Sequence, residues 1–346
     1  MKEAKHTTLY RLYRPQTFKE VRGQEQVVDM LEKAIKNKKI AHAYLFSGGR
    51  GTGKTSVARI LARGLGVSDK DLYEIDAASN RGIDDIRELR EGVYAMPFES
   101  PYKFYIIDEA HMLTKEAWNA LLKTLEEPPA HAIFVLATTE RHKVPDTIQS
   151  RCELYTFKQP TREIIAEMLT DVAKAENHTL ELAAAELIAL LAEGSFRDAL
   201  GILQKVLTVS SEKKIDVANV EHVSGAPRSE LIRTLLQALA EKNKGAGLKA
   251  VREAIKENFD IRTLLKLLMH RMRIVLLLRH APDLAKELKG ELAESDWELA
   301  QKLSKDASAG ISADTLRLLL KAYTEMSYAA LPHLPLELAI IDIASK

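Results

Sequence analysis

Cysteine is nearly absent from this chain of 346 residues, and other features are missing as well. The one cysteine, Cys152, excludes an internal disulfide and a zinc site built from cysteines. No apolar run approaches the ~20 residues that a membrane-spanning helix needs. The first residues, MKEAKHTTLYRLYRPQTF, contain no apolar core of the kind that secretory signal peptides carry. We therefore expect a cytoplasmic protein with no membrane partner.

An excess of charge of one sign is also missing. Lysine and arginine together number 50 and aspartate and glutamate 49, so the net charge is +1. This balance gives no global attraction to nucleic acid, and any binding of DNA would need a local basic track. There is no internal repeat and no low-complexity tail. The length is typical of two or three domains.

Short β-rich runs alternate with helical patterns between about residues 40 and 160. Alternation at this spacing is typical of βαβ units, so it predicts an α/β domain with a parallel sheet and helices on both faces. The expected strands are AYLFSG (43–48), LYEIDAAS (72–79), YKFYIIDE (102–109), AIFVLATT (132–139) and ELYTFKQ (153–159). Helical patterns near 53–65, 83–94 and 114–126 separate the first four of these strands.

The rest of the chain has a helical pattern. Three helices are expected at about 161–176, 180–193 and 195–208, and a polar stretch at 209–230 is a plausible connector. Further helical segments follow at 230–243, 261–280, 313–331 and 334–346. We therefore predict an α/β domain at 1–159, a small helical domain at 160–222 and an all-helical domain at 223–346.

The segment after the first expected strand matches the phosphate-binding pattern G-x-x-x-x-G-K-[ST]. Glycines let backbone N–H groups wrap around phosphates without Cβ clashes, and the following helix aims its N-terminal dipole at the anion. Lys54 would supply a charge to the β- and γ-phosphates, and the Thr55 hydroxyl would bind Mg²⁺. We predict an ATP and magnesium site in this loop. Its residues are Gly48, Gly49, Arg50, Gly51, Thr52, Gly53, Lys54, Thr55 and Ser56.

A second motif agrees with this site. FYIIDEAH ends an apolar strand with Asp108 and Glu109. Asp108 would hold Mg²⁺ through water, and Glu109 would orient and polarise the attacking water. The next strand ends in LATT, so Thr138 or Thr139 would lie beside Asp108 and could bond the γ-phosphate or the water. The sequence does not separate these two threonines.

Two arginines and one helix entry are further candidates. Arg151 in QSRCE and Arg197 in GSFRDAL could neutralise charge in a transition state, although a surface salt bridge is the better explanation on residue type alone. A helix N-terminus bearing arginines could also bind a DNA phosphate. A solvated helix face explains that pattern as well, because acidic residues in its first turn would repel phosphate. These candidate DNA residues are Asn80, Arg81 and Arg87.

These motifs, in this order, resemble the AAA+ clamp-loader ATPase family and most closely its bacterial DNA polymerase III gamma/tau members. The resemblance is dense from residue 9 to about 205 and looser at LPLELAIIDI near the end. It is carried by LYRLYRPQTFKEVRGQEQVV, AHAYLFSGGRGTGKTSVARILA, IDAASNRGIDDIREL, IIDEAHMLTKEAWNALLKTLEEPPAH, LATTE, IQSRC and GSFRDAL.

The resemblance implies an AAA+ P-loop domain with a five-stranded parallel sheet, then a lid domain and an all-α collar for oligomerisation. It makes Arg151 an arginine finger that reaches the ATP of a neighbouring subunit and Arg197 the sensor 2 residue. Thr138 or Thr139 would be sensor 1. The implied partners are other clamp-loader subunits in a pentameric ring, a sliding clamp and primer-template DNA. The adenine would lie against Tyr10, Arg14, Pro15 and Val21.

The chain departs from the family pattern in two places. GLGVSDKDL stands where bacterial members usually carry four zinc-binding cysteines, so we expect no zinc. The resemblance also places the end of this sequence after the collar, so we expect either a gamma-like short form or a truncated chain, without the long extension of the tau form. The alternatives are an archaeal or eukaryotic-type loader small subunit, another AAA+ DNA-processing ATPase, a non-hydrolysing ring subunit or, from DEAH at 108–111, a helicase. A helicase of that class would need a second sheet domain, and a non-hydrolysing subunit usually lacks the equivalents of Lys54 or Thr55.

Overall fold

The computed structural model describes residues 8–80, 82–210, 212–306 and 308–345. The chain divides into two compact units, one built from the residues up to 164 together with 193–198, the other from 165–192 and the residues from 199 onward. The three domain ranges predicted from the sequence stay a prediction. Within the ranges that the structure describes, no helix combines the length and apolar character needed to cross a lipid bilayer.

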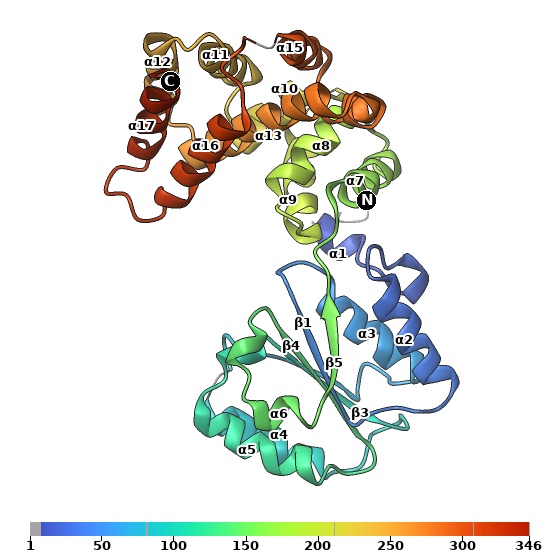
Figure 1. Ribbon diagram of the computed structural model, residues 1–346. Helices are drawn as coiled ribbons and strands as arrows, with labels where there is room; N and C mark the ends of the chain where they lie inside the picture. Colours follow the sequence, from blue (N-terminus) through green and yellow to red (C-terminus); the bar gives the residue numbers. More distant parts are fainter. Residues whose placement is uncertain (1–7, 81, 211, 307, 346) are drawn as a thin grey trace. The chain divides into compact units, whose positions relative to one another are not determined.

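The first unit contains the predicted five-stranded sheet, in the order β2-β3-β4-β1-β5 (Figure 1). All neighbouring strands are parallel, with Ser47 opposite Thr138 and Asp76 opposite Asp108. Because the carboxyl ends of parallel strands share one edge, the candidate residues that follow β1, β3 and β4 are brought together there. The strands are β1 (Ala43–Gly48), β2 (Leu72–Asp76), β3 (Lys103–Asp108), β4 (Ala132–Thr138) and β5 (Glu153–Phe157).

Helices cover both faces of this sheet, because successive side chains along a strand point to opposite faces. Phe46 and Ile106 are buried in the cluster that α2 and α3 complete, and Leu45 and Ile107 in the cluster under α4 and α5. The helices are α1 (Leu9–Leu12), α2 (Glu25–Lys36), α3 (Lys54–Gly64), α4 (Ile83–Val93), α5 (Lys115–Glu126) and α6 (Asp146–Gln149), with 3₁₀ turns η1 (Phe18–Glu20), η2 (Ala110–Met112) and η3 (Arg141–Lys143).

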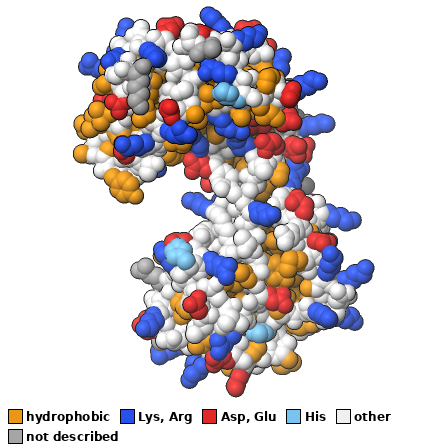
Figure 2. Space-filling model, in the orientation of Figure 1, with side chains coloured by type: hydrophobic (Ala, Val, Ile, Leu, Met, Phe, Trp, Pro, Cys, Tyr) orange, Lys and Arg blue, Asp and Glu red, His pale blue; other side chains and the backbone are white. Residues whose placement is uncertain are grey.

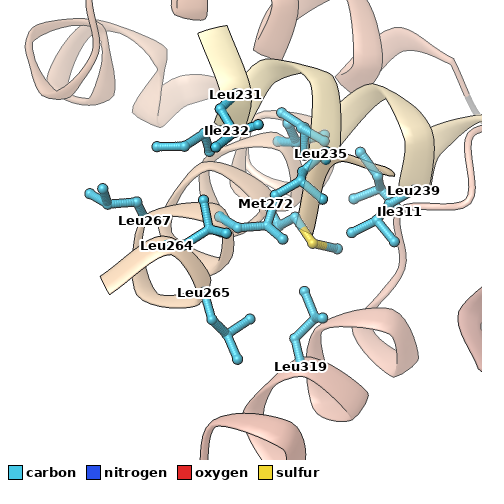
Figure 3. Packing of buried hydrophobic residues seen from close by; sticks show 14 of the residues in the cluster. Leu231, Ile232, Leu235, Leu239, Leu264, Leu265, Leu267, Met272, Ile311 and Leu319 are labelled. Atoms are coloured by element: carbon cyan, nitrogen blue, oxygen red, sulfur yellow. The ribbon is translucent and has the colours of Figure 1, made fainter. Parts of the chain in front are cut away.

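The second unit is helical, as predicted, apart from the paired short strands β6 (Thr179–Leu180) and β7 (Lys214–Ile215). Its core brings together Leu235, Leu264, Met272 and Leu319 from three helices (Figure 3). Both α7 and α9 begin within the first unit. The helices are α7 (Arg162–Ala175), α8 (Leu182–Leu191), α9 (Phe196–Val209), α10 (Val217–Ser224), α11 (Ser229–Ala240), α12 (Lys244–Lys256), α13 (Ile261–His280), α14 (Ala285–Leu288), α15 (Glu294–Lys305), α16 (Ala313–Glu325) and α17 (Leu334–Ile343), with 3₁₀ turns η4 (Pro282–Leu284) and η5 (Lys289–Glu291).

The polar stretch predicted as a connector contains β7 and α10, so that prediction was wrong in part. The carboxylate of Asp216 accepts the N–H of Asn219 at 2.9 Å, and the Asn219 side chain accepts the N–H of Asp216 at 3.0 Å. Gly225 ends the helix with a φ of 69°. These caps provide hydrogen-bond partners for backbone groups at the ends of α10. The helix depends on them because, among the described residues, Val220 is its only fully buried apolar side chain.

Candidate functional site

Two glycines let the loop between β1 and α3 approach other parts of the first unit closely. A Cβ at Gly48 would overlap the carbonyl oxygen of Phe157, and a Cβ at Gly51 would overlap the hydroxyl of Ser195. The carbonyl of Gly51 also accepts the N–H of Phe196 at 3.1 Å. The loop therefore rests against β5 on one side and the start of α9 on the other.

The next residues form the start of α3. Gly53 has a φ of 101°, and a Cβ there would meet no atom within 4 Å among the described residues. Lys54 is buried, and its Nζ donates to the carbonyl oxygens of Gly48 at 2.8 Å and Gly49 at 2.7 Å. Thr52 is buried too and donates to Gly49 at 2.9 Å. The loop is thus ordered by its own lysine, with open space on the Gly53 side.

Positive charge gathers around this loop. Burial lowers the pKa of Lys54, the carboxylates of Glu109 and Asp108 raise it, and the charge of Arg197 lowers it. Burial is also the main cause that lowers the pKa of Arg14, and Arg197 again contributes. A bound anion would offset the repulsion that Arg197 exerts on Lys54 and on Arg14. The electrostatics therefore suit a triphosphate.

Thr55 and Asp108 meet at the carboxyl edge of the sheet. The Thr55 hydroxyl donates to Asp108 Oδ2 at 2.7 Å, and Asp108 Oδ1 accepts the N–H of Glu109 at 3.0 Å. Hydroxyl and carboxylate oxygens are hard ligands of the kind that Mg²⁺ prefers. The donor set therefore fits the predicted magnesium ion.

Glu109 has an unusual backbone, with φ 47° and ψ 42° in the left-handed region. That region costs about 1–2 kcal/mol for a residue with a Cβ, and such strain is common at functional sites. The Glu109 carboxylate accepts the Thr139 hydroxyl at 3.1 Å and lies 3.5 Å from Nδ1 of His111.

The two threonines after β4 have different surroundings. Thr138 is fully buried, accepts the N–H of Glu140 at 3.0 Å and lies 3.1 Å from Nδ1 of His111. Thr139 is the one that contacts Glu109. The choice between them as sensor 1 stays a prediction, but the contacts favour Thr139.

The N-terminal segment also reaches the loop. Arg14 Nε donates to the Ser56 hydroxyl at 2.9 Å. The Arg197 guanidinium lies 5.8 Å from the centroid of the Tyr10 ring, a distance typical of a cation–π contact. Tyr10 and Arg14 are therefore placed at the loop by Arg197 and Ser56.

The other predicted nucleotide residues are less closely tied to the loop. Pro15 is half-buried, and Arg50 is exposed. Val21 lines an open groove of about 480 Å³ together with Phe18 and residues of α2. That groove includes none of the phosphate-loop residues, so an adenine pocket at Val21 stays a prediction.

Arg151 has its partners outside the loop. Its guanidinium donates to Glu126 Oε1 and to the Thr147 carbonyl, both at 2.6 Å. Among the described residues, none of the phosphate-loop side chains is its hydrogen-bond or ion-pair partner. Within one copy, the structure therefore does not bring Arg151 to Lys54.

The candidate DNA residues contact their own neighbours. The Asn80 amide donates to the Asp76 carbonyl at 3.2 Å, and Arg87 pairs with Asp84 at 3.2 Å. Arg81 lies outside the described residues. These contacts identify no phosphate site at α4, and the three residues stay a prediction.

Several residues of the site were not predicted from the sequence. Ser195 and Glu126 carry no local motif, because their partners are far along the chain. His111 does have a signal, since it is the last residue of the DEAH tetrad, but that tetrad pointed to a helicase. Burial raises the pKa of the Cys152 thiol to about 12, which disfavours the reactive thiolate.

Comparisons with known proteins show which family this chain is similar to. Family models match for "DNA polymerase III, delta subunit" at residues 23–72 and 67–161, for "DNA polymerase III clamp loader subunit, ATPase lid domain" at 164–212, and for "DNA polymerase III subunits gamma and tau domain III" at 215–346. The DNA polymerase III subunit tau of Bacillus subtilis is 38% identical, over 98% of this chain and 63% of that protein. The chain belongs to the DNA polymerase III gamma/tau family.

Other members of the gamma/tau family are similar to this chain as well. Subunit tau of Escherichia coli is 38% identical over 78% of this chain and 46% of that protein. Subunit gamma/tau of Mycoplasma genitalium is 43% identical over 62% of this chain and 40% of that protein. The chain therefore spans from 40% to 63% of the length of these three relatives.

The fold of this gamma/tau family member is the predicted AAA+ fold. The Holliday junction branch migration motor RuvB of Thermotoga maritima superposes with a TM-score of 0.53 at 24% identity, over 66% of this chain and 80% of that structure. This likeness concerns the fold alone. In the described residues beyond 160, the only strands are the two-residue β6 and β7, so the second sheet domain of a DEAH helicase is not found there.

Proposed function

We propose that this chain is an ATP-hydrolysing motor subunit of a clamp loader, a cytoplasmic assembly that places a sliding clamp on primed DNA during replication. It would work in a pentameric ring with other clamp-loader subunits. The observation that carries this proposal is the meeting of Lys54, Thr55, Asp108 and Glu109 at one sheet edge, in a chain of the gamma/tau family. An intact set of this kind favours a hydrolysing subunit over a structural one.

The residues present fit ATP and Mg²⁺. When bound, the pair supplies a reactive γ-phosphoryl group and a divalent charge that neutralises the phosphates. Lys54 would exchange its two carbonyl partners for phosphate oxygens, and Thr55 would bind the metal with Asp108 acting through water. Glu109 would polarise the attacking water. Thr139 and Arg197 would contact the γ-phosphate and so respond to its presence.

Arg151 would act between subunits. Its fork of N–H donors is bonded at the edge of its own α5, so it is free of the phosphate loop of its own copy. An arginine in this position suits a role toward the nucleotide of a neighbouring copy. ATP would then join two subunits, and hydrolysis would weaken their contact.

An exposed apolar loop after α4 supports the sliding clamp as a partner. Tyr94, Met96 and Phe98 are 58%, 74% and 82% exposed. Asp71 holds this loop, because its carboxylate accepts the N–H groups of Phe98 at 2.6 Å and Glu99 at 3.0 Å. Apolar side chains presented on an anchored loop are typical of a protein interaction site.

The outer face of α17 supports assembly with other subunits. Leu336 and Ile340 are buried on its inner side, whereas Leu334, Leu338 and Ile341 are exposed. Hydrophobic side chains also gather over α16 and α17 on the face shown in Figure 2. A helix that is apolar on both sides suits a place between packed neighbours. The proposal that DNA is a partner is supported by membership of the gamma/tau family.

The test is capture of a sliding clamp by the reconstituted loader, scored by co-purification with and without ATP. We expect capture to require ATP, Lys54→Ala to abolish both capture and hydrolysis, and Phe98→Ser to abolish capture while hydrolysis persists. Met30→Ser removes another exposed apolar side chain of the first unit and should change neither. Capture that needs no ATP, or that survives both Lys54→Ala and Phe98→Ser, would refute the proposal.

A further inference from the structure

His111 lies beside the Glu109 carboxylate, and the proposed function assigns it no role. Its side chain is 8% exposed and lies on the 3₁₀ turn η2, directly after β3. Both ring nitrogens face oxygen atoms that come from the ends of two neighbouring strands. An apolar side chain could fill this space, but it would remove the polar contact that links Thr138, Glu109 and Glu140.

The two nitrogens have different partners. Nδ1 lies 3.1 Å from the Thr138 hydroxyl oxygen and 3.5 Å from Glu109 Oε2. Nε2 lies 3.4 Å from Glu140 Oε1. The imidazole therefore joins the residue after β3 to the residues that end and follow β4. A proton on Nδ1 would be donated between Thr138 and Glu109.

In the described part of the chain, two side chains contact the Glu109 carboxylate, and each can restrict its position. Asp108 accepts its backbone N–H, which holds the main chain in the left-handed conformation. The carboxylate itself contacts the Thr139 hydroxyl on one side and His111 on the other. A general base acts only when its oxygen is held within reach of the water that it polarises.

We propose that His111 is the positioning residue for Glu109: the proton on its Nδ1 holds the carboxylate against the end of β4. This inference rests on the proposed function. Among the described residues, the hydrogen-bond and ion-pair partners of His111 include neither the phosphate loop nor the magnesium ligands, so it would affect turnover without changing nucleotide affinity.

The test compares turnover with nucleotide binding in the reconstituted complex. We expect His111→Ala to lower kcat about tenfold to a hundredfold, the range typical when support for a catalytic group is lost. The dissociation constant for a fluorescent, non-hydrolysable ATP analogue should stay unchanged. His111→Asn keeps an amide where Nδ1 lies and should restore most of the turnover. His111→Gln extends toward the Nε2 position and should not.

A matched control lies beside the site. His142 also faces Glu140, at 3.7 Å, but it is 76% exposed, and Glu109 is not among its ion-pair partners in the described part of the chain. His142→Ala should leave turnover unchanged. Equal turnover in the Asn and Gln variants, or full turnover in His111→Ala, would overturn the inference. Because the Asn variant retains a polar side chain, it tests the role even if His111→Ala fails to fold.

A second readout needs no hydrolysis. In the nucleotide-free chain, Glu109→Gln should change the ¹⁵N chemical shift of His111 Nδ1 more than that of Nε2, with the signal assigned by its loss in His111→Asn. No change at Nδ1 would contradict the contact. A wild-type complex that hydrolyses no ATP would overturn the proposed function, whereas an active wild type with an equally active His111→Ala would overturn this inference alone.

Discussion

At the scale of single residues, Arg151 is fixed at the end of α5 by contacts with Glu126 and Thr147. Glu126, its partner, is the last residue of α5, where the helix dipole disfavours a carboxylate. The guanidinium offsets that cost and is in turn kept at the surface by Glu126 and Thr147. A salt bridge, which the sequence favoured as the ordinary explanation, therefore exists and is compatible with a role toward another copy.

If Arg151 acts on the ATP of a neighbouring subunit, Arg151→Ala should leave ATP binding nearly intact and lower clamp- and DNA-stimulated hydrolysis by about 10³-fold or more, the range known for arginine fingers. Steady-state hydrolysis by the assembled complex measures this. Arg151→Lys keeps the charge but loses the forked donor, so it should remain strongly impaired. Stimulated hydrolysis at the wild-type rate in the alanine variant would exclude the role.

Much of the candidate site could be predicted at this scale, because its residues follow strands in short motifs. Lys54, Thr55, Asp108 and Glu109 are examples. The contact of Thr139 with Glu109 could not be predicted, because it depends on which of two adjacent side chains points to the neighbouring strand end. His111 was visible as part of DEAH, but only the geometry shows what it touches.

At the scale of elements, Asp71 connects the start of β2 to the exposed loop that follows α4. Burial by itself would raise the pKa of this carboxyl, but the N–H groups of Phe98, Glu99 and Ser100 and the Ser100 hydroxyl lower it to about 2. Its ordinary value is 3.8. The unfolded chain therefore takes up the proton first as the pH falls, so the stabilisation is complete above about pH 4 and declines toward pH 2.

Asp71→Asn should lower the free energy of unfolding by about 2–4 kcal/mol at pH 7, because several N–H donors lose a charged acceptor. The difference in Tm between wild type and variant should shrink as the pH is lowered from 4 toward 2. Thermal unfolding measured across this range, with amide exchange at Phe98 and Glu99, checks both points. A Tm difference that grows as the pH falls below 4 would contradict a lowered pKa at Asp71 in the folded chain.

The elements themselves were predictable to different degrees. The strands of the sheet stand out because residues such as Ile106 and Val135 lie in near-continuous apolar runs that are buried on both faces. Helix α10 is different, because it buries little and depends on the caps at Asp216 and Gly225. Its capping residues are in the sequence, but without an apolar stripe they resemble a polar turn.

At the scale of the whole molecule, the outer face of α17 bears on assembly. Leu338→Glu places a charge among exposed apolar side chains without touching the buried inner side. We expect monomer folding to be unchanged and ring assembly to be lost, as judged by circular dichroism and analytical ultracentrifugation. Lys249→Glu, on the neighbouring α12, introduces the same carboxylate with a larger change in net charge and should assemble normally if the apolar face is the contact.

The close approach of Gly51 to Ser195 limits how these two positions can change during evolution. A Cβ at position 51 would occupy the space of the Ser195 side chain, so a larger residue at 51 requires a change at 195. In related sequences, the residues at positions 51 and 195 should therefore change together or both remain small. A phosphate loop transferred from an unrelated ATPase should not fit unless the residue at position 195 is exchanged with it.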